Sequence, residues 1–189
     1  YHDGKASVVR INPDGSVGEM TAEVFHKGMG SIAERNYRPH ITCARITPDG
    51  KFLTASDVGL DQVKLYGFDA KTGAIKLVDI LRCELESSPR SMIFSPDGRF
   101  AYLICQLKNC VNVYTYNSDD GMPHFEMIQQ ISTLGKSYND KSAVAAIKQS
   151  VDGKYIFCSN AGDNSIAFFV RDEKTGMLTK NCVLPISGD

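Results

Sequence analysis

Three stretches of the chain share one layout of apolar runs and turns, and this repetition constrains the fold more than any other feature. The stretches are Ile41–Leu81, Ser91–Ser132 and Ala143–Ile186. Each contains four apolar runs, separated by glycine-bearing turns and polar breaks of the kind that bound β-strands. The first two runs of each stretch are joined by Pro48-Asp49-Gly50, Pro96-Asp97-Gly98 and Val151-Asp152-Gly153. A four-strand unit repeated at intervals of about 48 and 55 residues is typical of a β-propeller blade.

The repeats predict an all-β fold, a β-propeller built of four-stranded antiparallel blades. The divisions expected within the single domain 1–189 are the second half of a blade and then three whole blades, over 1–26, 38–82, 88–132 and 141–186. A helix longer than a turn or two is expected nowhere outside Met20–Tyr37. Because a closed propeller ring usually has four to eight blades, we expect these three and a half or so blades to be an internal piece of a longer chain. We therefore expect missing blades or a second copy to cover its open edges.

The composition argues against several classes of function. A net charge of −1 and a pI near 6.5 do not suit a nucleic-acid or anionic-membrane surface. No apolar stretch approaches the roughly 18 residues that would span a bilayer. The six cysteines lack CxxC spacing, and buried free thiols in a reducing cytoplasm are favoured over disulfides or metal ligands. These features predict a cytoplasmic protein that binds neither nucleic acid nor membrane.

Common catalytic and cofactor motifs are absent from the chain. It contains no GxSxG elbow, HExxH, P-loop or GxGxxG pattern. Of the four histidines, only His40 falls where the blades are expected to converge, so a multi-histidine metal site is not predicted. We accordingly predict no cofactor and no metal.

Polar residues interrupt the apolar pattern at one end of the predicted blades. In a four-strand meander the Asp-Gly turns share one end, while the segment leading into the first strand and the loop after the second share the other. The residues singled out at that second end are Arg38, His40, Asp57, Arg90, Gln106, Lys148 and Asn160. Polar groups in such places either make structural hydrogen bonds or line a pocket. We expect the arginines, His40, Gln106 and Lys148 to cluster there.

Each of these residues has a structural and a functional interpretation. Arg90 either forms a buried pair or, since its candidate partner Gln106 is neutral, binds an anion or a carbonyl group. His40 is either a general base or a loop histidine with its hydrogen bonds satisfied. Asp57 is expected first to order the turn at Gly59 through its own side chain, with ligand binding as a secondary role.

The same residues resemble a known family. The segments Pro39-His40, Ser56–Val63, Ser88-Pro89-Arg90 and Ser159–Ile166 resemble the lactonase family of seven-bladed β-propellers, in order and in spacing. That family includes 6-phosphogluconolactonases and carboxymuconate-lactonizing enzymes. The resemblance covers essentially the whole chain and implies a full-length protein of about twice this length.

The resemblance implies a hydrolase that opens a sugar lactone such as 6-phosphogluconolactone, its partner being a small-molecule lactone or anionic sugar derivative. The residues assigned to catalysis are His40, Arg90 and Gln106. The residues assigned to substrate binding are Arg38, Asp57, Lys148 and Asn160.

The site also departs from the family pattern. The family's glutamate falls on Gln106, its second arginine on Ala161, and two of its histidines on Ser91 and Thr42. A glutamine keeps the shape and hydrogen bonding of glutamate but cannot accept a proton. The site is therefore interpreted as partly degenerate, and the alternative is a non-catalytic propeller that serves as a ligand-binding or protein-interaction module.

Overall fold

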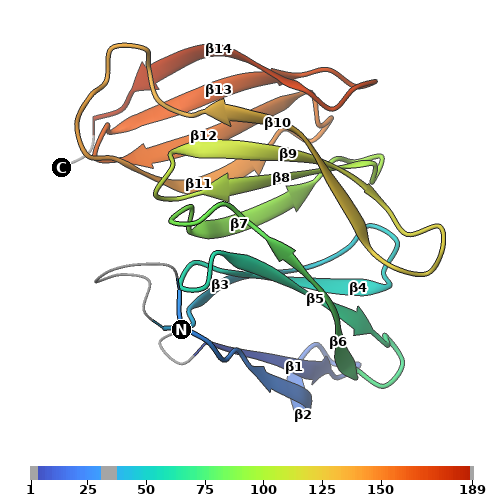
Figure 1. Ribbon diagram of the computed structural model, residues 1–189. Helices are drawn as coiled ribbons and strands as arrows, with labels where there is room; N and C mark the ends of the chain where they lie inside the picture. The colour runs from blue at the N-terminus through green and yellow to red at the C-terminus, as the bar shows by residue number, and fades with distance from the viewer. Residues whose placement is uncertain (1–3, 31–37, 188–189) are drawn as a thin grey trace.

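The computed structural model describes residues 4–30 and 38–187, and within these ranges the chain forms strands and turns without helices (Figure 1). The expectation of an all-β fold is therefore confirmed. Met20–Phe25, where a short helix was allowed, belongs to a strand. Residues 26–30 form no helix, and the remaining part of that allowance, from 31 to 37, lies outside the described residues. In the described ranges no helix is long and apolar enough to cross a membrane.

The strands form one two-stranded and three four-stranded antiparallel sheets, which makes the chain a partial β-propeller. The first sheet contains β1 (Lys5–Ile11) and β2 (Val17–Phe25). The second contains β3 (Ile41–Ile46), β4 (Phe52–Asp57), β5 (Gln62–Phe68) and β6 (Ile75–Arg82). The third contains β7 (Pro89–Phe94), β8 (Phe100–Cys105), β9 (Cys110–Asn117) and β10 (His124–Ser132). The fourth contains β11 (Ala143–Gln149), β12 (Tyr155–Ala161), β13 (Ser165–Arg171) and β14 (Leu178–Pro185).

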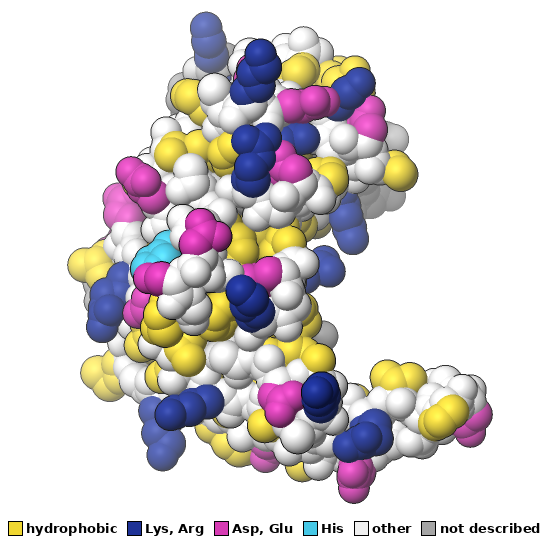
Figure 2. Space-filling view, turned by 90° about the vertical axis from the view of Figure 1, so that its right-hand side faces the viewer, with side chains coloured by type: hydrophobic (Ala, Val, Ile, Leu, Met, Phe, Trp, Pro, Cys, Tyr) yellow, Lys and Arg dark blue, Asp and Glu magenta, His cyan; other side chains and the backbone are white. Residues whose placement is uncertain are grey.

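In every four-stranded sheet the spatial order of strands follows the chain, so each sheet is a simple meander. The first strand of each meander lies innermost, because β7 packs between β3 and β11. Together the sheets form an open crescent, and Figure 2 shows its hollowed side. The residues on the three inner strands therefore line the hollow where a propeller has its axis.

The Asp-Gly turns owe their shape to a hydroxyl and a carboxylate. Thr47 donates from Oγ1 to Asp49 Oδ1 at 2.6 Å and accepts the backbone N–H of Phe52 at 3.0 Å. Ser150 makes the matching bond to Asp152 at 2.6 Å. The turn glycines have φ near +70°, a region that favours residues without a Cβ. The same turn therefore ends the inner strand in each meander.

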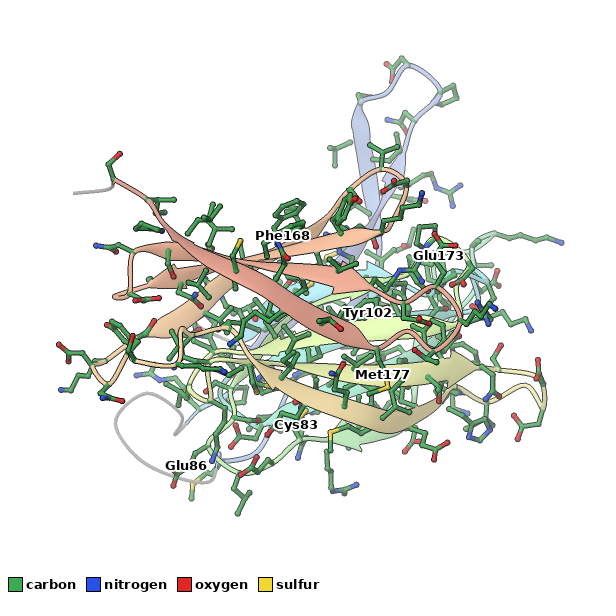
Figure 3. All side chains as sticks on the ribbon, turned by 90° about the horizontal axis from the view of Figure 1, so that it is seen from above. Cys83, Glu86, Tyr102, Phe168, Glu173 and Met177 are labelled. Atoms are coloured by element: carbon green, nitrogen blue, oxygen red, sulfur yellow. The ribbon has the colours of Figure 1, made fainter. Side chains whose placement is uncertain are left out.

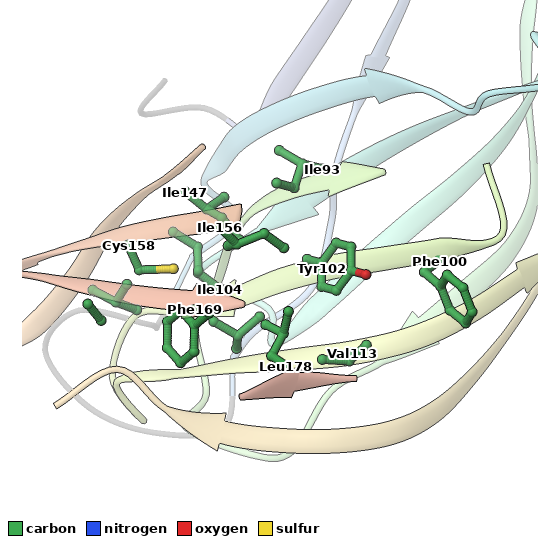
Figure 4. Close-up of a cluster of buried hydrophobic side chains, with 13 residues drawn as sticks. Ile93, Phe100, Tyr102, Ile104, Val113, Ile147, Ile156, Cys158, Phe169 and Leu178 are labelled. Carbon is green, nitrogen blue, oxygen red and sulfur yellow. The ribbon is translucent and has the colours of Figure 1, made fainter. Parts of the chain in front are cut away.

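The hydrophobic core lies between neighbouring sheets. The largest cluster joins the third and fourth sheets and includes Tyr102, Ile104, Ile156 and Phe169, none of which is exposed (Figure 4). Smaller clusters join the second sheet to the third and to the first. Each sheet is thus stabilised mainly by the sheets beside it, as expected for propeller blades.

The fourth sheet packs on the third sheet with one face, and among the described residues no sheet lies against its other face. Tyr155 and Phe157 are 39% and 38% exposed, and both rings pack on Phe168, which Figure 3 labels. Phe100 and Tyr102 hold the same places after the preceding Asp-Gly turn and are only 5% and 0% exposed. This face is the one that a further blade would cover.

Candidate functional site

A β-bulge lies near the start of each inner strand. Ile41 pairs with Asp57 and Cys43 with Ser56, so Thr42 between them has no partner on β4. The register shifts in the same way at Arg90 on β7 and at Ala145 on β11. A bulge re-aims its side chain and is common beside active sites.

Hydrogen bonds join the three bulges into a chain across the sheets. Thr42 Oγ1 donates to the backbone carbonyl of Arg90 at 2.6 Å. Arg90 Nε in turn donates to the backbone carbonyl of Ala145 at 2.8 Å. The side chain at one bulge therefore donates a hydrogen bond to the backbone carbonyl at the next bulge. Arg90, at the middle bulge, takes part in both bonds.

Arg90 also contacts Gln106, the neutral residue that the sequence indicated as its candidate partner. Arg90 Nη1 donates to Gln106 Oε1 at 2.8 Å, and the backbone N–H of Gln106 bonds to Ser88 O at 2.9 Å. Arg90 is half-buried, and its Nη2 makes no hydrogen bond to any residue that the structure describes. The guanidinium is thus anchored on one side and keeps donors for a ligand on the other.

Asp57 does not face the hollow, so its assignment as a substrate-binding residue is wrong in position. Its side chain is fully buried, and its Oδ2 lies 2.6 Å from His26 Nδ1. Its Oδ1 accepts the backbone N–H groups of His40 at 2.8 Å and Gly59 at 2.9 Å. The expected bond to Gly59 is therefore confirmed, and the carboxylate supports the segment that carries His40.

His26 is the partner that sequence reasoning missed. It follows β2, in the preceding sheet, and its ring stacks on Tyr66 with the centroids 6.2 Å apart. Burial, together with the charge of Asp57, raises the pKa of Tyr66 to about 12, so this phenol stays neutral at physiological pH. The pair of His26 and Asp57 ties the first two sheets together behind the hollow.

Asn160, the residue equivalent to Asp57 in the fourth sheet, is likewise structural. It is only 2% exposed, and its Nδ2 donates to Thr133 O and to Ser165 Oγ, both at 3.0 Å. These bonds tie the end of β12 to the connection between sheets. The burial of Asn160 contradicts its assignment to substrate binding.

Lys148 lies at the other end of its strand from the bulge, which contradicts the expected cluster. It is exposed and lines a cavity of about 390 Å³ with Arg45, Phe94 and Gln149. The bulge at Ala145 is three residues away, or about 10 Å at roughly 3.3 Å per residue. Lys148 therefore lies at the end of the blades where the Asp-Gly turns are, opposite to the end where Arg90 lies.

Arg38 and His40 do lie at the same end as Arg90. A Cβ on Gly59 would overlap the carbonyl oxygen of Arg38, so the loop between β4 and β5 packs directly on this segment. The Arg38 side chain is exposed and His40 is half-buried. The site at this end therefore brings together Arg38, His40, Arg90 and Gln106. No group of three or more His, Cys, Asp or Glu side chains in 4–30 and 38–187 could hold a metal ion.

The comparisons with known proteins agree with the propeller fold. A family described as "Lactonase, 7-bladed beta-propeller" matches residues 1–189. The chain belongs to the seven-bladed β-propeller lactonase family. This confirms the resemblance to that family and the partial β-propeller fold.

The relatives of this lactonase-family chain include named and uncharacterised proteins. It is 37% identical to an uncharacterised Lactococcus lactis protein, over 89% of this chain and 48% of that one. It is 33% identical to the 6-phosphogluconolactonase of Bacillus subtilis, over 94% of this chain and 50% of that one. A solved periplasmic gluconolactonase from Pseudomonas aeruginosa superposes with a TM-score of 0.86 at 26% identity, covering 97% of this chain and 51% of that one. The chain thus spans about half the length of the relatives it matches.

Proposed function

We propose that the full-length protein opens a sugar lactone such as 6-phosphogluconolactone by hydrolysis. The single observation that carries this proposal is the position of Arg90. A β-bulge turns it out of the strand pairing, and Gln106 and the Ala145 carbonyl anchor it. The proposal is supported by family membership and by the 33% identity to a 6-phosphogluconolactonase.

In the proposed reaction, Arg90 binds the lactone through its outward N–H groups. Hydrogen bonds to the lactone carbonyl oxygen would stabilise the negative charge that develops there as water attacks the carbonyl carbon. The ring C–O bond then breaks, the ring oxygen leaves as a hydroxyl group, and the product is a carboxylate with release of a proton. His40, or a residue of the blades outside this chain, takes the proton of the attacking water.

Arg38 is proposed to bind the anionic part of the substrate. Its side chain is exposed at the same end as Arg90. The preference for a phosphorylated lactone follows the Bacillus subtilis relative, whereas the Pseudomonas aeruginosa structure is of a gluconolactonase. Both kinds of lactone therefore belong in the first assay.

The second candidate is a propeller that binds a ligand or a protein without catalysis. Gln106 favours it, since the partner of Arg90 is an amide and offers no proton acceptor. The Thr42 hydroxyl also favours it, since it is bonded to the main chain of Arg90. Under this alternative the site would bind an anionic sugar without turnover.

The deciding experiment is a pH-stat assay of the full-length protein, with the uncatalysed opening of each lactone subtracted. The substrates are 6-phosphogluconolactone and gluconolactone. We expect hydrolysis above background that Arg90→Ala abolishes and that Arg45→Ala, an exposed arginine at the opposite end, leaves unchanged. Calorimetric binding of 6-phosphogluconate without any hydrolysis would instead establish the binding module.

Location and macromolecular partners remain predictions. The near-neutral charge still favours a protein without nucleic-acid or membrane partners, and the cysteine pattern still favours the cytoplasm. A similar structure is periplasmic, so fractionation of cells that express the full-length protein is the appropriate check.

A further inference from the structure

Three of the six cysteines meet beside the hairpin that carries Gln106. Cys105 ends β8, Cys110 begins β9, and the two are direct cross-strand partners. The amide of Asn112 bonds to both sulfur atoms, from Nδ2 to Cys105 Sγ at 3.5 Å and from Cys110 Sγ to Oδ1 at 3.7 Å. Cys83, which Figure 3 labels, lies in the connection between β6 and β7 and packs against the hydrophobic cluster that contains Cys105 and Cys110.

The backbone already has the spacing that a disulfide requires. Directly opposed residues on antiparallel strands have Cα atoms roughly 4.5–5.5 Å apart, within the range of roughly 4.4–6.8 Å that disulfides span. The shared contact with Asn112 places both thiols on one face of the sheet. A bond between them therefore needs rotation of side chains and no movement of strands.

We propose that Cys105 and Cys110 form a reversible disulfide that clamps the four-residue loop carrying Gln106. The loop is joined to the rest of the site by two kinds of bond. Gln106 Oε1 accepts a hydrogen bond from Arg90, and the Leu107 N–H bonds to Ser87 O at 3.2 Å. Closing the disulfide would fix both ends of this loop and restrict the motion of Gln106 relative to Arg90.

The oxidant is a small disulfide such as glutathione disulfide, and Cys110 reacts first. A hydrogen bond between the two thiols lowers the pKa of Cys110 and raises that of Cys105, which favours Cys110 as the thiolate. Cys110 is only 4% exposed, so the reaction requires a local opening of the adjoining loop, in which Leu107 is 37% exposed.

The reaction is balanced by two exchanges. The Cys110 thiolate attacks glutathione disulfide and releases one glutathione thiolate, which takes up the proton that Cys110 lost. Cys105 then attacks the Cys110 sulfur of the mixed disulfide and releases the second glutathione. The protein loses two electrons and two protons, and both are recovered in the two glutathione thiols.

The test uses the full-length protein incubated with glutathione disulfide, followed by alkylation of the remaining thiols and digestion without reduction. Trypsin cleaves after Arg99 and Lys108, so Cys105 and Cys110 fall in different peptides. We expect a disulfide-linked species of these two peptides that dithiothreitol removes. We also expect amide hydrogen exchange in the loop 106–109 to slow on oxidation and to recover on reduction.

Two variants make the result specific. Cys110→Ser should abolish both the linked species and the change in exchange. Cys158→Ser removes a buried thiol in a different core cluster and should abolish neither. A link from Cys83 to either residue, no link at all, or a link without slower exchange in the loop would overturn the proposal.

Discussion

Arg90 on β7 donates a hydrogen bond from Nε to the backbone carbonyl of Ala145 on β11, at 2.8 Å. The bond crosses from one blade to the next, so the side chain proposed to bind substrate also joins two sheets. Any substitution of Arg90 must therefore be evaluated for both ligand binding and stability.

Replacing Arg90 should separate these two roles. Arg90→Ala in the full-length protein should weaken binding of 6-phosphogluconate by about 1.5–3 kcal/mol, the usual range for a hydrogen bond to a charged group. Arg90→Lys should recover only part of this, because an ammonium group cannot make a bidentate pair. Calorimetry measures the affinity, and urea unfolding measures any loss of the contact with Ala145. Unchanged affinity in Arg90→Ala would leave Arg90 with the structural role alone.

Restoring a carboxylate beside Arg90 should raise the rate of lactone hydrolysis. Gln106→Glu places an acidic group where Gln106 Oε1 now lies 2.8 Å from Arg90 Nη1. The arginine should hold the pKa of the new side chain below the usual glutamate value of about 4.3, so the base is available at neutral pH and is lost only in stronger acid. The same charge should weaken anion binding. Initial rates from pH 4 to pH 8 check this, with Gln149→Glu at the opposite end as the control that should show no gain. No gain from Gln106→Glu would favour the binding module.

The buried pair of His26 and Asp57 should contribute more stability than its counterpart in the fourth sheet. Asp57→Ala leaves the N–H groups of His26, His40 and Gly59 without their acceptor, and we expect a loss of about 3–5 kcal/mol. Asn160→Ala removes bonds between neutral groups and should cost about 1–3 kcal/mol. Urea unfolding of the two variants makes the comparison, and equal losses would show that the carboxylate has no special role.

Asp49 should link two blades in a way that depends on pH. Beyond its own turn, its Oδ2 accepts hydrogen bonds from Tyr116 and Ser118 of the next sheet. Burial opposes ionisation, but the bonds from Ser118, Thr47 and others outweigh it and lower the pKa of Asp49 below 3.8. Its stabilisation is therefore complete above the unfolded pKa of about 3.9 and is lost as the pH falls through the folded pKa.

The matched pair of substitutions is Asp49→Asn and Asp152→Asn. Asp152 makes the same turn bonds, and its hydrogen-bond partners among the described residues all lie within that turn. At pH 7 we expect Asp49→Asn to lose about 1 kcal/mol more than Asp152→Asn, because only Asp49 bonds to the neighbouring sheet. Unfolding experiments at pH 7 and pH 3 should show this difference shrinking in acid. A difference that is constant with pH would contradict the assignment to the carboxylate.

The fold could be predicted because its signals are local. An Asp-Gly turn such as Pro48-Asp49-Gly50 requires a particular backbone conformation, and the apolar runs around it reveal the strands. The approximate place of Arg90 and its contact with Gln106 also followed, because both residues flank the first hairpin of one meander.

Other parts of the site depend on contacts and registers that no local pattern reveals. His26 and Asp57 are 31 residues apart and lie in different sheets. The bulge at Ala145 shifts the alternation of β11 by one residue, so periodicity could not tell which side chains face the hollow. The sequence pattern predicts that Lys148 belongs to the segment leading into the first strand, whereas β11 continues to Gln149 and carries Lys148 towards the turn.

The acceptors that join the bulges are main-chain carbonyl oxygens, and these are present whatever amino acid occupies the position. The carbonyl of Ala145 accepts the hydrogen bond from Arg90 as any other residue's carbonyl would. The carbonyl of Arg90 likewise accepts the hydrogen bond from Thr42. The side chain at a bulge therefore does not need to accept the hydrogen bond from the neighbouring blade. Exchanging one of these side chains therefore removes the bond that it donates to the next blade, but the residue's own carbonyl stays available to the blade before it.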